Sequence, residues 1–156
     1  MDVTLRPLHD GDAEVLFAWE RDPVAVRMAA FTRADPDDRA AFDAHLARIR
    51  ADPGVRMRMV EVDAEAVGTV AAFDADGERE VTYWIARAHW GRGIATAALT
   101  ALLAEQPVRP LAARVAEANV ASRRVLERAG FVEVARERAF APGVGAEVVE
   151  LLLRLG

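Results

Sequence analysis

The spacing of hydrophobic residues changes along the chain, and each spacing predicts a different kind of element. In the first fifty residues apolar side chains recur every three to four positions, as in Phe42, Leu46 and Ile49, which is typical of the buried stripe of a helix. Asp35–Asp38 is expected to start that helix, with an acidic N-cap and a proline in the first turn. This half of the chain is predicted to contain a strand over 3–6 and helices from Asp10 or Asp12 to about Arg21 and from Asp35 to about Ala51.

From residue 56 onward the apolar positions alternate with polar ones or form short continuous runs, which favours strands. Strands are predicted over 56–62, 67–73, 79–86, 111–116, 131–138 and 147–154, and helices over 94–105 and 120–129. The resulting order, β-α-α-β-β-β-α-β-α-β-β, indicates an α/β fold in a single domain over residues 1–156.

Composition narrows the range of functions. The formal net charge of −5 argues against nucleic-acid binding, which requires a basic face, and fits either a cationic partner or solubility alone. The apolar runs are shorter than the roughly 18 residues that cross a bilayer, and the N-terminus lacks a signal-peptide pattern. A cytoplasmic protein with no membrane partner is therefore expected.

Two absences exclude several classes of chemistry. The sequence has no cysteine, and all 20 of its Lys and Arg residues are arginine. These absences exclude a disulfide, a thiolate zinc site, a cysteine nucleophile, a Walker lysine and a pyridoxal-phosphate lysine. The histidines lie far apart, so no metal site is expected. Ser122, the only serine, does not lie in a nucleophile-elbow sequence.

A glycine-containing turn, Trp90-Gly91-Arg92-Gly93, joins a predicted strand to a predicted helix. Glycine permits backbone angles by which successive N–H groups converge on an anion, and the start of the following helix adds unpaired N–H groups. Arg92 could pair with a phosphate. The two glycines by themselves could also merely close a tight connection, and Thr96 stands where a dinucleotide fingerprint has its third glycine.

The second motif is Asn119-Val120-Ala121-Ser122, at the start of the predicted helix over 120–129. Asn119 is a natural N-cap. Ser122 shares the packed side of the helix with Leu126, so its hydroxyl requires a partner, either the N-cap carbonyl or a functional group. The charged residues of the helix, Arg123, Arg124, Glu127 and Arg128, are expected on its solvated face.

Together, and in this order and spacing, the two motifs resemble those of the GCN5-related N-acetyltransferase (GNAT) superfamily. Thr4–Leu8, Glu80–Ile85 and Ala129–Phe131 are similar to its RimJ/RimL-like branch. The resemblance covers nearly the whole chain and implies the acyl-CoA N-acyltransferase fold, a mixed, mostly antiparallel twisted sheet flanked by helices. It also implies an enzyme that moves the acetyl group of acetyl-CoA directly to a primary amine, which is a protein N-terminus or a small molecule.

The resemblance implies a role for each matching residue. The cofactor site is expected to comprise Ile85, Arg87, Gly91, Arg92, Gly93, Ile94, Ala95, Thr96 and Asn119. Backbone N–H groups from Gly91 to Thr96 would hold the pyrophosphate, while the strand around Ile85 and the side chain of Asn119 would bind the pantetheine arm. Trp90 departs from the polar residue at the first position of the family signature.

Ser122 is expected to stabilise or protonate the departing thiolate. Glu80 is the candidate base, through a water if needed, with Glu61 and Tyr83 as alternatives. Some N-terminal acetyltransferases carry a glutamate where this chain has Arg114, so the base cannot be transferred by position alone. A solvated carboxylate is the alternative role for Glu80.

Other functions stay open at this point. A non-catalytic acyl-CoA sensor would keep the glycine turn and Asn119, a transferase could use succinyl-CoA, and a small dinucleotide-binding domain is disfavoured by the missing glycine. By family analogy, the segment Asp22–Thr32 and the loop near Pro142 are expected to line the acceptor cleft. The sequence is compatible with a homodimer.

Overall fold

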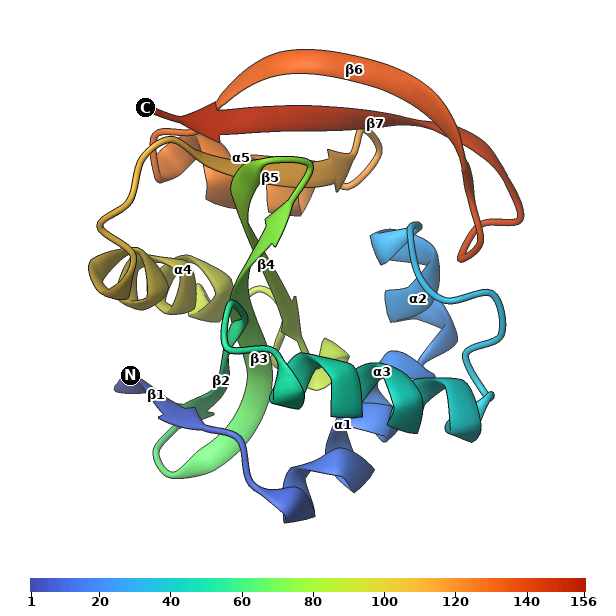
Figure 1. The fold of residues 1–156 in the computed structure, drawn as a ribbon, viewed down its shortest axis with the longest axis vertical. Helices are drawn as coiled ribbons and strands as arrows, with labels where there is room; N and C mark the ends of the chain where they lie inside the picture. Colours follow the sequence, from blue (N-terminus) through green and yellow to red (C-terminus); the bar gives the residue numbers. More distant parts are fainter.

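One seven-stranded sheet, in the order β1-β2-β3-β4-β5-β7-β6, forms the centre of the molecule (Figure 1). A computed structural model describes all residues, 1–156. The strands are β1 (Val3–Pro7), β2 (Arg56–Val62), β3 (Glu65–Ala75), β4 (Glu78–Ile85), β5 (Leu111–Ala116), β6 (Val132–Ala141) and β7 (Ala146–Leu155). All neighbours are antiparallel except β4 and β5, which run parallel. The predicted fold class, a mixed and mostly antiparallel sheet flanked by helices, is confirmed.

Helices cover both faces of this sheet. They are α1 (Ala13–Glu20), α2 (Pro23–Ala29), α3 (Arg39–Ala51), α4 (Ile94–Glu105) and α5 (Val120–Arg128), with short 3-10 turns at Asp10–Asp12 and Arg87–His89. Figure 1 shows α4 and α5 on one side of the sheet and α1, α2 and α3 on the other. No helix has both the length and the apolar character that a bilayer crossing requires.

The alternation of side chains along the strands produces a core on each face. Val81 and Ile85 of β4 point toward α4 and α5, where they join the main core with residues such as Leu99. On the opposite face, Met59 of β2 packs against Leu16 and Phe42 from α1 and α3. This second face also carries the polar residues Glu80, Thr82 and Arg114, and it is called the Thr82 face below.

The structure corrects two details of the predicted helices. Helix α2 lies inside a segment for which no helix was predicted, although Asp22 caps it by accepting from Val24 N at 3.0 Å and Pro23 occupies its first position. Helix α3 begins at Arg39, not at Asp35, and its N-cap is Asp38. The Asp35 carboxylate instead accepts from Asp37 N at 2.9 Å, which closes a separate turn before the helix.

Candidate active site

Strands β4 and β5 separate after a very short pairing. They are in register only at Arg79–Leu111 and Glu80–Ala112, so the rest of β4 has no strand on that side. Ala86 N donates to Val67 O on β3 at 2.9 Å. Because peptide groups alternate in direction along a strand, those of Tyr83 and Ile85 point away from β3, into the gap. An extended ligand could therefore pair with this free edge of β4.

The glycine turn lies at the end of that free edge. Gly91 and Gly93 adopt φ of 75° and 77°, and Gly93 is the N-cap of α4. The helical hydrogen bonds begin with Ala97 N donating to Gly93 O, so the N–H groups of the preceding residues, 94–96, have no partner within the helix. A Cβ at either glycine would meet no other atom within 4 Å, so the surface of the turn is open. This geometry suits an anion such as a pyrophosphate.

Trp90 explains how the turn is attached to the strand. Its indole Nε1 donates to Ile85 O at 2.8 Å, which fastens the start of the turn to the end of β4. Trp90 stands where the family signature has a polar residue. In the structure, the indole provides the hydrogen-bond donor at that place.

The Asn-x-x-Ser motif opens α5 on the other side of the gap. Asn119 caps the helix by accepting from Ser122 N at 3.2 Å, as predicted from its position. The Ser122 hydroxyl does not bond back to its own helix. Its Oγ lies 2.6 Å from the Tyr83 hydroxyl, which comes from β4 across the gap and also lies 3.2 Å from Ser122 O. Burial raises the pKa of Tyr83 above its usual value, despite the opposing bond to Ser122, so the phenol is protonated at neutral pH and is unsuited to act as a base.

These features face one cavity of about 460 Å³. Its walls comprise Ala25, Met28 and Ala29 of α2, Tyr83, Trp84 and Ile85 of β4, residues 89–91 and 93–96 of the turn and α4, and Asn119, Ala121, Ser122, Arg124, Val125 and Arg128 around α5. Arg124 and Arg128 have no carboxylate within 4 Å, unlike most arginines of the chain. The cavity therefore combines an apolar interior, a set of peptide groups and two free cations.

Two residues predicted for the cofactor site lie outside this cavity wall. The Arg87 guanidinium points toward the start of α2, where it pairs with Asp22 at 2.7 Å, instead of facing the glycine turn. Arg92 is exposed, its NH1 group lies 3.0 Å from His89 Nδ1, and it does not line the cavity.

Glu80 also lies outside the cavity wall, on the Thr82 face. It is largely buried and accepts from Arg114 Nε at 3.1 Å. Glu150 of β7, Asp76 and Glu137 also lie within 4 Å of the Arg114 guanidinium, at 3.5, 3.8 and 3.9 Å. Desolvation raises the pKa of Glu150, and the neighbouring Glu137 and Glu80 contribute in the same direction against the attraction of Arg114. Glu61, the other carboxylate considered, pairs with Arg6 at 2.8 Å near the far edge of the sheet.

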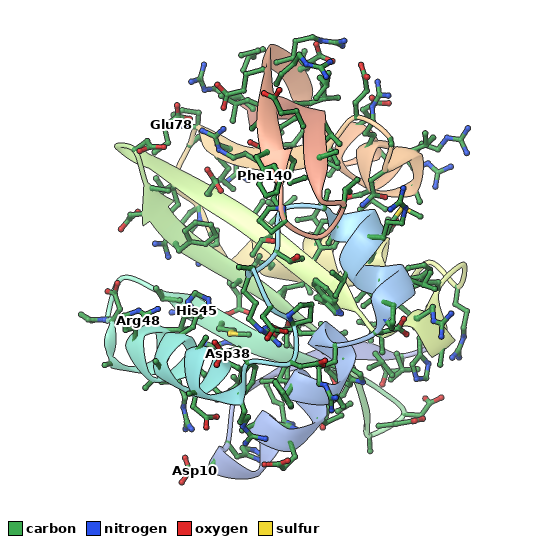
Figure 2. All side chains as sticks on the ribbon, turned by 90° about the vertical axis from the view of Figure 1, so that its right-hand side faces the viewer. Asp10, Asp38, His45, Arg48, Glu78 and Phe140 are labelled. Atoms are coloured by element: carbon green, nitrogen blue, oxygen red, sulfur yellow. The ribbon has the colours of Figure 1, made fainter.

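The two loops expected at the acceptor side do meet. Gly143 N, in the turn between β6 and β7, donates to Ala30 O at 2.8 Å, just after α2. A Cβ at Gly143 would lie 2.4 Å from Val26 O, so only glycine fits this close approach. Figure 2 shows the labelled Phe140 of β6 above the Thr82 face and His45 and Arg48 of α3 below it. The Thr82 face is thus bordered on two sides by segments distant in sequence.

Sequence reasoning missed several residues of the cavity. The segment Asp22–Thr32 was expected at the acceptor cleft but without a helix, so Met28 and Ala29 of α2 were not predicted in this cavity wall. The Asp22-Pro23 pair carried the same signal as Asp35-Pro36. Arg124 and Arg128 were assigned to a solvated face, and their i, i+4 spacing just after Asn119 was the available signal. The indole Nε1 of Trp84 is buried without a hydrogen-bond partner, and no sequence feature marked it.

A family model shows which family of proteins the chain belongs to. The sequence profile of the acetyltransferase (GNAT) domain matches residues 2–132. The chain belongs to the GNAT acetyltransferase family. No match is found among curated protein sequences.

Solved GNAT structures share the whole fold. RimJ of Mycobacterium smegmatis in complex with CoA-disulfide is 26% identical, with a TM-score of 0.78 and coverage of 98% of this chain and 81% of RimJ. Spermidine N-acetyltransferase of Vibrio cholerae in complex with CoA and spermine is 20% identical, with a TM-score of 0.80 over 97% and 95% of the two chains. A phosphinothricin acetyltransferase of Sinorhizobium meliloti in complex with acetyl-CoA is 18% identical, with a TM-score of 0.84 over 99% and 88%. At these identities the last two establish the fold alone.

Proposed function

We propose that this GNAT acetyltransferase transfers the acetyl group of acetyl-CoA to a primary amine in a ternary complex. The observation that carries the proposal is the alignment, along one cavity, of the free edge of β4, the open glycine turn and the hydroxyl pair of Tyr83 and Ser122. The CoA and acetyl-CoA complexes of the structural relatives support the choice of donor.

In the proposed complex, the N–H groups from Gly91 to Thr96 bind the pyrophosphate at the start of α4. The pantetheine arm extends β4 by pairing with the peptide groups of Tyr83 and Ile85 that point into the gap, of which Ile85 O also accepts from the Trp90 indole. The Asn119 amide, whose oxygen already caps α5, donates from its nitrogen. Arg124 and Arg128 supply positive charge to phosphate groups at the cavity wall.

The proposed chemistry is direct attack. The amine nitrogen attacks the thioester carbon, a free N–H of β4 stabilises the oxyanion, and Ser122 donates a hydrogen bond to the departing sulfur. Glu80 accepts the amine's proton through water. Its bond to Arg114 and its position outside the cavity wall leave no direct route to the nitrogen.

The acceptor is proposed to approach over the Thr82 face, where carboxylates outnumber cations. Four carboxylates lie within 4 Å of a single guanidinium, that of Arg114. This excess of negative charge favours a cationic amine by long-range attraction. Both a peptide N-terminus and a small amine fit this description.

Calorimetry with acetyl-CoA, succinyl-CoA and NAD tests the donor. We expect micromolar binding of acetyl-CoA and none of NAD, and tighter binding of NAD would contradict the proposal. A thiol-release assay with spermine and with an alanine-initiated peptide then tests transfer. Acetyl-CoA binding without thiol release on a broad amine panel would identify a sensor instead.

The variant Ser122→Ala tests the leaving-group role. We expect kcat to fall about tenfold or more, as a lost hydrogen bond to a charged group implies, while the KM for acetyl-CoA changes less than twofold. Ser122→Thr, which keeps a hydroxyl, is the matched control. Unchanged turnover in Ser122→Ala would remove Ser122 from the mechanism.

A further inference from the structure

The only tyrosine and the only serine of the chain form a single hydrogen-bonded pair across the gap between β4 and α5. The Tyr83 hydroxyl lies 2.6 Å from Ser122 Oγ, which is short for a bond between two hydroxyls. No other hydrogen bond involves Ser122 Oγ, and both residues line the cavity. The Tyr83 hydroxyl is therefore bonded within the protein, while the Ser122 hydroxyl remains free to bond a ligand as well.

The direction of the hydrogen bond decides what the serine can do. A phenol has one proton, and the Tyr83 hydroxyl faces two acceptors, Ser122 Oγ at 2.6 Å and Ser122 O at 3.2 Å. If the phenol donates to the backbone oxygen, the serine must donate to the phenol, and its proton is unavailable to a ligand. If the phenol donates to Oγ, the serine proton is free to enter the cavity. The shorter distance favours the second arrangement.

We propose that Tyr83 is a positioning residue, which donates to Ser122 Oγ and thereby directs the serine proton toward the leaving sulfur of the cofactor. This inference rests on the proposed function and adds to it a residue that acts through Ser122. The protonation state of the phenol is consistent with it, because burial raises the pKa of Tyr83 and keeps its proton in place at neutral pH.

With Tyr83 in this role, the bonds and protons of the proposed reaction balance. The C–S bond breaks, its electron pair stays on the sulfur, and the Ser122 hydroxyl donates a hydrogen bond to the thiolate. The proton that the attacking nitrogen loses passes through water to Glu80, and the thiolate takes up a proton from solvent when CoA leaves. Tyr83 keeps its own proton, so it needs no regeneration.

The experiment measures the thiol of bound CoA and needs no acceptor. If the hydroxyl pair stabilises a thiolate, the protein binds CoA more tightly above the pKa of its thiol, which for a free thiol is about 8.5. Calorimetric titrations from pH 6.5 to 9.5 with CoA, and with desulfo-CoA as the thiol-free control, isolate this effect. We expect the affinity of wild-type protein for CoA, relative to desulfo-CoA, to rise about tenfold over this range, which corresponds to a pKa lowered by about one unit.

Three variants test the route through Ser122. We expect Tyr83→Phe to reduce the tenfold rise to threefold or less, Ser122→Ala to abolish it, and the double variant to match Ser122→Ala. Desulfo-CoA affinity within twofold of wild type shows that each variant retains its fold and site.

Two other results would overturn the positioning role of Tyr83, and a third would overturn the proposed function. A wild-type rise that persists in Tyr83→Phe but is lost in Ser122→Ala would overturn the positioning role. No rise in the wild type would show that the pair does not face the sulfur, and would also overturn it. Absence of any CoA binding would instead overturn the proposed function.

Discussion

The cofactor wall, which is the lining of the cavity of about 460 Å³, and the Thr82 face are built in different ways. The cofactor wall comes mainly from two short stretches, residues 83–96 and 119–128, and it is proposed to bind its ligand through peptide groups. The charged centre of the Thr82 face is assembled around Arg114 from β4, β6, β7 and the turn at Asp76. Its members come from places up to 74 residues apart in the chain, Asp76 and Glu150.

This difference determines how each side responds to substitution. Peptide groups are directed by local backbone angles, so a change at one glycine acts on binding and little else. The charge cluster has one cation for four carboxylates, so removing Arg114 leaves those carboxylates without compensation.

The largest effect is expected at Gly93. Gly93→Asp places a negative charge where the pyrophosphate is proposed to bind, and we expect acetyl-CoA affinity to fall about 100-fold or more in calorimetry. Gly77→Asp is the matched control, because Gly77 has φ of 76° in the β3–β4 turn and equally open surroundings. Aspartate tolerates this backbone region better than most residues, so both variants should lose similar, small amounts of stability. Equal acetyl-CoA affinities for the two variants would contradict the phosphate site.

The next effect is expected at Arg114. Arg114→Ala leaves the largely buried Glu80 and the mostly buried Glu150 without their cation, and we expect a loss of about 2 kcal/mol in the free energy of unfolding by urea. Acetyl-CoA affinity should stay within threefold, since the cluster lies outside the cavity wall. Arg138→Ala, at an exposed position of β6, is the control and should cost under about 0.5 kcal/mol.

A smaller effect is expected at Trp90. Trp90→Phe removes the indole donor from Ile85 O while keeping an aromatic ring. One neutral hydrogen bond contributes about 1 kcal/mol, so acetyl-CoA should bind about fivefold more weakly by calorimetry. Trp19→Phe, on α1 and outside the cavity, should bind acetyl-CoA as the wild type does.

The smallest effect is a pH dependence at Glu150. Because the pKa of Glu150 is raised in the folded state, its ionised form destabilises the fold above that pKa, and the penalty vanishes below its unfolded value. We therefore expect Glu150→Gln to be more stable than wild type at pH 7, by about 0.5 kcal/mol in the free energy of unfolding. This difference should disappear as the pH falls toward 4.5. Thermal melts at several pH values measure it. A Glu150→Gln variant that is less stable at pH 7 would mean that the attraction of Arg114 outweighs desolvation.

Much of the fold was predictable because the sequence patterns that mark its elements lie within a few neighbouring residues. The seven strands follow from alternating or continuous apolar runs, and α4 and α5 follow from Gly93 and Asn119 at their N-caps. Helix α2 was missed because it is only seven residues long, and the start of α3 was misplaced because an aspartate side chain closed a turn before it. Short elements lack the repeated periods on which sequence reasoning depends.

The sequence by itself determined the glycine turn, the Asn119 cap and the position of Ser122 on the packed side of α5, because each depends on residues within one or two helical turns. Only the tertiary structure decided the partner of Ser122, which is Tyr83, 39 residues earlier. It also placed Glu80 beside Arg114 and turned Arg87 toward Asp22. These outcomes depend on where β4 and β5 part and on how α2 lies across the sheet, and no local spacing encodes either.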